Sequence, residues 1–343
     1  MSASAILEKM HVRRGNALTD AGLRKRFRKK ELYGYTRWIW SLCRFLLIFG
    51  LGFVILYPLL QILSKVFMPT DQYQDLSVIW IPKSLTLDNI KNAIMYTKFW
   101  ESLVNSMILC LSCAAIQIVV CSLTGYGFGR FRFPFREPLF LMVILTIIVP
   151  TQIIFLPSFV QYRFFDFFGI SKLMGLITGK NYTEYAVNLI DTRWSFWIPS
   201  FFGVGLRSGI FIYLFRQCFR GISKELEEAA KIDGCGSIVT YLRIMLPNAK
   251  SSILTVFLFS IVWHWNEYTL TRTFFPQKYQ PLAIQLRLAI DSMMSDLNTR
   301  TNLSFQMGVT YAAVLLFILP VLIIYIFTQR WFVEGVESSG IKG

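Results

Sequence analysis

Long apolar stretches recur along the chain and are separated by shorter polar segments. Six of them are candidate membrane spans: 45–64, 102–129, 139–162, 194–215, 251–275 and 305–329. A helix needs about 20 apolar residues to cross about 30 Å of hydrocarbon. The fourth stretch contains one charge, Arg207, and the fifth becomes mixed aromatic after residue 263. The pattern predicts an all-α polytopic membrane protein with six transmembrane helices.

Basic residues gather before the first stretch and predict the orientation of the spans. Residues 1–37 hold ten Lys or Arg against three acidic residues. Such a block normally stays in the cytoplasm and can touch anionic lipid, although a regulatory or partner-binding tail is an alternative. With the N-terminus inside, six spans return the C-terminus inside. The expected domains are a basic leader 1–37, a transmembrane domain 38–329 with an inner loop 216–250, and a cytoplasmic tail 330–343.

The composition is typical of a protein embedded in a lipid bilayer. Of the 343 residues, 54% are hydrophobic and only 16% are charged, whereas a soluble domain carries about a quarter charged residues. The formal net charge of +15 would suggest nucleic acid in a soluble protein. Here much of it lies in the leader, so we expect contact with the lipid bilayer and no nucleic acid.

The loop between the fourth and fifth stretches predicts a short helix with sharp ends. Ser223 is a good N-cap residue, and the acidic residues after it complement the positive end of a helix. Ala229 and Ala230 favour a helix and leave a flat surface. Gly234 can adopt the left-handed conformation that ends a helix. A second amphipathic stretch leads to Pro247, where the next span can begin.

Seven residues of this loop match a signature of importer permeases that work with a binding protein. The signature is Glu-Ala-Ala, three residues, Gly, nine residues and Ile-x-Leu-Pro, carried here by Glu228, Ala229, Ala230, Gly234, Ile244, Leu246 and Pro247. The chain therefore resembles the inner-membrane permeases of ABC importers. In that family the short helix docks on the ATP-hydrolysing subunit, so the resemblance assigns these seven residues to ATPase coupling. A capped surface helix alone explains Ser223 and Gly234 but not the remaining positions.

The tail carries a second resemblance, to the carbohydrate (maltose-type) subfamily. Residues 330–335 and 340–343 look like the C-terminus of that subfamily, and 265–267 resemble it in the fifth stretch. The resemblance implies a permease in the bacterial cytoplasmic membrane that forms half of the path for a carbohydrate, expected to be an oligosaccharide, with an anionic one among the candidates. It also implies a second permease subunit in a heterodimer, two ATP-binding subunits and an extracytoplasmic solute-binding protein.

No sequence pattern for catalysis accompanies these features. We find no Walker-type phosphate loop G-x-x-x-x-G-K-[ST], no nucleophile elbow and no zinc motif. We therefore expect no enzyme activity, no cofactor and no metal in this chain, with ATP used by the partner subunit. The alternative function is an ion-gradient-driven secondary transporter of a polar solute. Such transporters place Asp, Glu or His in their spans, and the clear intramembrane acid here is Glu267.

One arginine lies inside a predicted span. Arg207 precedes Arg216, at the inner end of the fourth span, by nine residues, or about 13 Å of helix. A central arginine is costly in hydrocarbon and needs a partner or a wet path. We expect it to face the substrate path and to bind an anionic or richly hydroxylated sugar, near Trp265, Asn266 and Glu267. A structural pair with Glu267, or a contact with the partner permease, is the alternative.

Overall fold

The computed structural model describes residues 37–340. The predicted leader 1–37 thus lies outside the described residues except for Arg37, and the tail is described as helical backbone as far as Gly340. The chain divides into two compact units, residues 1–63 and 64–343. A helix over Arg37–Val66 accounts for the described part of the first unit. The described residues contain no strand, only an isolated bridge between Phe165 and Val187.

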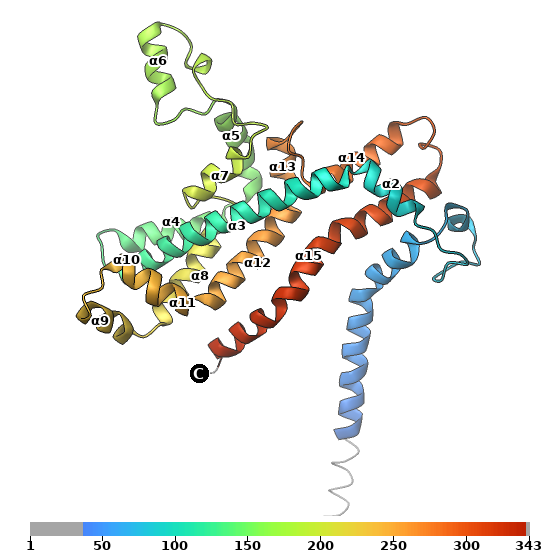
Figure 1. The fold of residues 1–343 in the computed structure, drawn as a ribbon, viewed down its shortest axis with the longest axis horizontal. Helices are drawn as coiled ribbons and strands as arrows, with labels where there is room; N and C mark the ends of the chain where they lie inside the picture. Colours follow the sequence, from blue (N-terminus) through green and yellow to red (C-terminus); the bar gives the residue numbers. More distant parts are fainter. Residues whose placement is uncertain (1–36, 341–343) are drawn as a thin grey trace, which may run out of the picture. The chain divides into compact units, whose positions relative to one another are not determined.

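The second unit is built from helices of very different lengths (Figure 1). Its first half contains η1 (Thr70–Gln74), α2 (Asp88–Tyr96), α3 (Phe99–Arg130), α4 (Arg136–Ile148), α5 (Thr151–Arg163), α6 (Ile170–Thr178) and η2 (Tyr182–Glu184). Its second half contains α7 (Trp194–Phe201), α8 (Ser208–Gly221), α9 (Lys224–Ile232), α10 (Ser237–Thr240), η3 (Tyr241–Met245), α11 (Leu246–Asn248), α12 (Lys250–Asn266), α13 (Thr269–Phe274), α14 (Leu282–Ser295) and α15 (Leu303–Gly340).

Three helices in the described residues are long and apolar enough to cross a membrane. They are Arg37–Val66, α3 and the Leu303–Arg330 part of α15, and they confirm the helices predicted at 45–64, 102–129 and 305–329. Two bent pairs could each add a crossing, α4 with α5 and Ser237–Asn248 with α12. The all-helical membrane fold is therefore confirmed, with three to five candidate crossings by length and composition.

The stretch predicted as one span at 194–215 differs from the prediction, because it is broken in the middle. Helix α7 stops at Phe201 and α8 begins at Ser208, with non-helical backbone between them. Two residues of this break have positive φ, Gly203 at 69° and Arg207 at 59°. Average hydropathy does not detect this break, because Phe202, Val204 and Leu206 keep the stretch apolar on average despite its two glycines and Arg207.

Two further predicted spans are also interrupted. The 139–162 stretch bends by 103° between α4 and α5. The cause is Pro150, which forces extended backbone on Val149 and starts the next helix. The 251–275 stretch ends as a regular helix at Asn266 and resumes as α13 at Thr269, so its mixed aromatic part is a separate short helix. Each interruption leaves backbone groups without helical partners at that point.

Helices α3 and α8 form the centre of the second unit. Gly125 of α3 approaches Phe215 of α8 so closely that a Cβ at this position would lie 2.6 Å from the Phe215 Cβ. Phe211, Phe215 and Phe219 of α8 are buried against α3 and the α10–α12 segment. The two helices run in parallel, since Gln117 contacts Ser208 near one end and Gly129 lies by Phe219 near the other.

Candidate functional site

The structure confirms the short helix predicted after Ser223. The Ser223 hydroxyl accepts the Glu225 backbone N–H at 3.2 Å and caps α9. At the other end, Gly234 has a φ of 79°. The Cys235 N–H donates to the Ala230 carbonyl at 2.9 Å and the Gly234 N–H to the Lys231 carbonyl at 3.0 Å. This pair of bonds is the Schellman arrangement, in which glycine is favoured because it has no Cβ.

The seven signature residues divide between an exposed face and the core. Glu228, Ala229, Gly234 and Pro247 are exposed, Ala230 is buried, and Ile244 and Leu246 are half-buried. The last two pack against the core cluster of α3 and α8. Glu228, Ala229 and Gly234 lie on α9 or directly after it, whereas Pro247 lies in α11. Figure 1 shows α9, α10 and α11 at one end of the second unit. The structure therefore leaves part of the signature exposed and packs the rest against the core.

Glu227 fastens α9 to α3, a role that the sequence analysis missed. Its Oε1 accepts the Tyr126 hydroxyl at 2.9 Å, and its Oε2 lies 3.5 Å from the Arg130 Nε. Both charged side chains are largely buried, at 13% and 5% exposed. Arg130 also donates to the Ile222 carbonyl just before α9. The available signal was the i, i+4 spacing of Tyr126 and Arg130 on one helix face.

A second contact joins α3 to the segment after α9. The Tyr241 and Ser122 hydroxyl oxygens lie 2.7 Å apart in a hydrogen bond, and the Tyr241 ring lies 5.2 Å from the Tyr126 ring. Tyr241 begins the π-helical turn η3, which continues to Met245 in the core cluster. Single π-helical turns within α-helical segments occur often at functional sites. The α9–α11 segment is therefore held to α3 at both ends.

A cavity of about 400 Å³ forms where the broken helices meet. Its walls come from the α4–α5 junction, the break between α7 and α8, and α13, with Val149, Val204 and Leu270 as representatives. Serine hydroxyls, Gln161 and Arg207 provide its polar lining. Non-helical backbone at membrane depth is tolerated where it lines a cavity or is buried in protein. The arrangement is typical of a small-ligand site formed by discontinuous helices.

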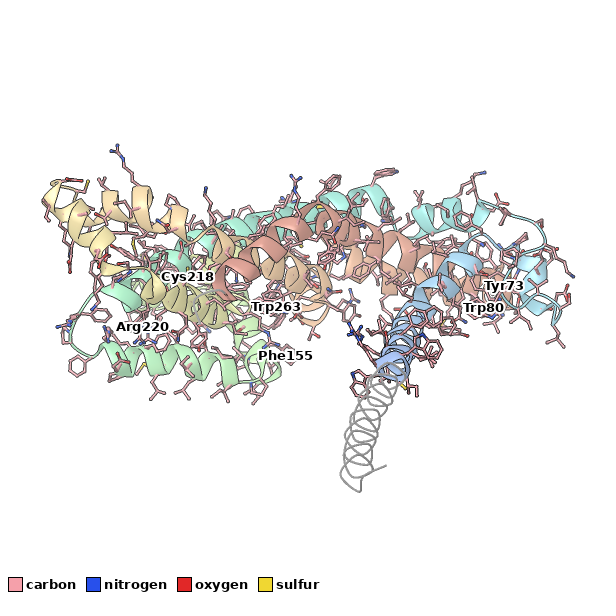
Figure 2. All side chains as sticks on the ribbon, turned by 90° about the horizontal axis from the view of Figure 1, so that it is seen from below. Tyr73, Trp80, Phe155, Cys218, Arg220 and Trp263 are labelled. Atoms are coloured by element: carbon pink, nitrogen blue, oxygen red, sulfur yellow. The ribbon has the colours of Figure 1, made fainter. Side chains whose placement is uncertain are left out.

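Arg207 lines this cavity from the N-cap position of α8. Its guanidinium lies 5.9 Å from the centre of the Trp263 ring, within the range of a cation–π contact. Among the side chains that the structure describes, in residues 37–150 and 153–330, no carboxylate forms an ion pair with it. Figure 2 labels Trp263 and the cavity residue Phe155, as well as Cys218 and Arg220 nearer the other end of α8.

The three neighbouring candidates, 265–267, are placed elsewhere. Trp265 is buried and donates from Nε1 to the Phe317 carbonyl of α15 at 3.1 Å. Asn266 donates to the Val262 carbonyl of its own helix at 2.8 Å. The Glu267 Oε1 accepts the Leu270 backbone N–H at 2.9 Å and so caps α13. The structure therefore brings only Arg207 of the four predicted path residues to the cavity.

Comparison with known proteins finds transport system permease proteins that match most of the chain. It is 25% identical over 299 residues to the arabinooligosaccharides transport system permease protein AraQ of Halalkalibacterium halodurans, covering 85% of this chain and 93% of the relative. It is 25% identical over 306 residues to the maltodextrin transport system permease protein MdxG of Bacillus subtilis, covering 88% and 96%.

A solved structure shares the fold. It is the crystal structure of a bacterial ABC transporter involved in the import of the acidic polysaccharide alginate; the TM-score is 0.64 at 19% identity, covering 86% of this chain and 96% of that one. The family described as binding-protein-dependent transport system inner membrane component matches residues 117–337, more than half of the chain and including the cavity, α8 and α9. The chain therefore belongs to the family of inner membrane components of binding-protein-dependent transport systems.

Proposed function

We propose that this chain is the permease subunit of an ABC importer in which α9 receives the movement of a separate ATP-hydrolysing subunit. The observation that carries the proposal is the form of α9, which is capped at both ends and fastened to α3 through Glu227. A helix held in this way moves with α3 as one body. Movement imposed on its exposed face therefore reaches the membrane-embedded helices.

In the proposed topology the chain crosses the bacterial cytoplasmic membrane six times, with both termini in the cytoplasm. The basic leader supports this orientation through the positive-inside rule. The broken helices α4–α5, α7–α8 and α12–α13 act as crossings, because the non-helical backbone of the first two breaks, together with α13, lines a cavity. The α9 helix then lies on the cytoplasmic face, within reach of an ATP-binding subunit.

The proposed partners are a second permease subunit in a heterodimer, two ATP-binding subunits and an extracytoplasmic solute-binding protein. ATP is used by the partner, and this chain is proposed to hold no cofactor or metal. Large apolar side chains exposed on and after α9 support a protein partner there, including Leu226, Ile232 and Ile238. Contiguous apolar patches on a protein surface often mark protein interaction sites.

We propose a carbohydrate substrate, specifically an oligosaccharide, with an acidic one favoured by Arg207. The relatives named for arabinooligosaccharide and maltodextrin transport support a carbohydrate, and the transporter that shares the fold is described for an acidic polysaccharide. The Arg207 guanidinium at the N-terminal end of α8 supports an anionic group, because the helix dipole adds to its positive charge. Arginine also recognises carboxylates in a bidentate manner.

The secondary-transporter alternative is not favoured. The family works with a binding protein, and Glu267, the acid that suggested an ion relay, caps the N-terminal turn of α13. A carboxylate that satisfies a backbone donor has a structural role, which requires no gradient-driven proton or ion.

Two substitutions test α9 as the coupling element. Glu228→Lys reverses the charge of its exposed face, and Gly234→Pro is incompatible with a φ of 79°. In proteoliposomes containing the complete importer, we expect the uptake per ATP hydrolysed to fall about tenfold or more while the chain still inserts. Lys224→Gln, on the same helix but outside the signature, is the control. Normal uptake in both variants would reject α9 as the coupling element.

A further inference from the structure

A fully buried glutamine near the middle of α3 holds the broken backbone that precedes Arg207. The Gln117 Nε2 donates to the Leu206 carbonyl at 2.8 Å and to the Ser208 hydroxyl oxygen at 3.0 Å. Its Oε1 accepts the Ser260 hydroxyl of α12 at 2.7 Å. Gln117 and Ser260 are 0% exposed, and Ser208 is 1% exposed. One side chain thus joins α3, α8 and α12 on both sides of the residue that lines the cavity.

The network continues to His264, one turn further along α12. Its Nδ1 lies 2.8 Å from the Ser260 carbonyl and 3.3 Å from the Ser260 hydroxyl oxygen. Because a carbonyl oxygen can only accept, Nδ1 carries the proton and donates it. The Nε2 atom is buried and has no hydrogen-bond partner among the described residues. Buried polar groups are costly unless they are hydrogen-bonded, so we infer that this network stabilises a particular backbone conformation.

The backbone group that the network stabilises is the Leu206 carbonyl. Leu206 lies in the break between α7 and α8, where no helical N–H is available to this oxygen. The next residue, Arg207, has a φ of 59°, a region that non-glycine residues rarely adopt. Such a conformation persists only when the surroundings hold it. Gln117 supplies this support by fixing the carbonyl before Arg207 and the side chain of Ser208 after it.

We propose that Gln117 is a positioning residue of the substrate path, which fixes the α7–α8 break and so sets the direction in which Arg207 meets the substrate. Its side chain is absent from the cavity lining, so it acts through the Leu206 carbonyl and the Ser208 hydroxyl on either side of Arg207. The proposal rests on the proposed function for its transport consequence, whereas its geometric part concerns only the shape of the break.

A chemical reporter at Val204 tests the geometric part. Val204 is exposed in the break and lines the cavity, so Val204→Cys reacts with a membrane-impermeant methanethiosulfonate at a rate that depends on the shape of the break. The background chain has its six native cysteines replaced by alanine. Gln117→Leu, which keeps the size but removes every hydrogen bond, should change this rate about fivefold or more.

Two further variants separate positioning from general packing. Ser260→Ala removes the donor to Gln117 Oε1 but leaves the bond to Leu206, so the labelling rate should stay within about twofold of the parent. Gln117→Asn keeps the amide on a shorter side chain and should give an intermediate labelling rate. This variant provides the test of positioning if Gln117→Leu does not insert into the membrane. An unchanged rate in both Gln117 variants, or equal changes in Ser260→Ala, would overturn the proposal.

The transport arm distinguishes this proposal from the proposed function. The wild-type importer and Gln117→Asn are assayed for uptake of trigalacturonate, which is acidic, and maltotriose, which is neutral. We expect the variant to raise the half-saturating concentration of the acidic sugar more than that of the neutral one. Altered labelling with no uptake of either sugar by the wild type would keep Gln117 as a positioning residue and reject the substrate assignment. Equal effects on both sugars would overturn its role in setting Arg207.

Discussion

At the residue scale, Glu227 is the best-placed single side chain for joining α9 to the bundle. Glu227→Ala removes the carboxylate and leaves the Arg130 guanidinium 5% exposed without its anion. We expect a loss of about 2 kcal/mol in the free energy of unfolding, because an unpaired buried charge is costly. Thermal unfolding in detergent measures it. Glu225→Ala, exposed on the same helix, should stay within about 0.5 kcal/mol, and equal losses would contradict the anchoring role.

Phe135 offers a prediction of the opposite sign. It is 76% exposed and has a φ of 62°, a conformation that suits glycine and is unfavourable for a residue with a Cβ. Phe135→Gly should therefore raise the stability by about 0.5–1 kcal/mol, measured by thermal unfolding in detergent.

Phe133→Gly is the matched control for this position. Phe133 has no positive φ, and its ring lies 5.8 Å from that of Phe128. The glycine there should lower the stability, since it loses the ring contact and adds backbone freedom. Loss of stability in Phe135→Gly as large as in Phe133→Gly would show that the positive φ carries no cost.

Residue-level prediction from the sequence succeeded where the effect is local and failed where it is tertiary. Ser223 and Gly234 cap α9 as expected because capping depends on neighbouring backbone groups. Glu227 was assigned only to the helix dipole, because its partners lie about 100 positions earlier on another helix. Gln117 gave no signal at all, since a glutamine inside an apolar run does not reveal what it pairs with.

At the element scale, the close approach of α3 and α8 is the feature most sensitive to change. Gly125→Ala would place a Cβ 2.6 Å from the Phe215 Cβ and 2.9 Å from the Arg216 backbone nitrogen. Since these atoms belong to the backbone and to the first carbon of a buried side chain, we expect a cost of about 2 kcal/mol in thermal unfolding.

Gly127→Ala, on the same helix, is the control for Gly125→Ala. No atom lies within 4 Å of the added Cβ, so the change should raise stability by up to about 1 kcal/mol through helix propensity. If the two alanine variants behaved alike, the tight contact between α3 and α8 would be refuted.

Hydropathy located the helices but could not predict their breaks. It found the Arg37–Val66 helix, α3 and α15, since apolar length alone determines such helices. The α7–α8 break was missed although it contains Gly203, Gly205 and Arg207, because the apolar residues between them keep the stretch apolar on average. The sharp bend at Pro150 could be located by its residue type, but its angle depends on tertiary contacts that periodicity does not encode.

At the scale of the second unit, helix α8 connects the cavity to α9. The N-cap residue of α8 is Arg207 at the cavity, and its last residue, Gly221, is followed within three positions by α9. Its 14 residues extend about 21 Å. Helix α3 runs beside it and carries Gln117 at the α7–α8 break and Tyr126 and Arg130 at α9. In the proposed mechanism, displacement of α9 acts on the cavity through these two parallel helices.

The proposed function requires α9 to contact the ATP-hydrolysing partner on the cytoplasmic side, which a cross-link can measure. Ala229→Cys, exposed on α9, is introduced without the native cysteines and treated with a bifunctional maleimide in inside-out vesicles holding the complete importer. Lys172→Cys on the exposed face of α6 is the control. We expect position 229 to be joined to the ATP-binding subunit and position 172 to remain free of it. Modification of position 229 from outside intact cells, with no ATP-binding subunit captured, would contradict it.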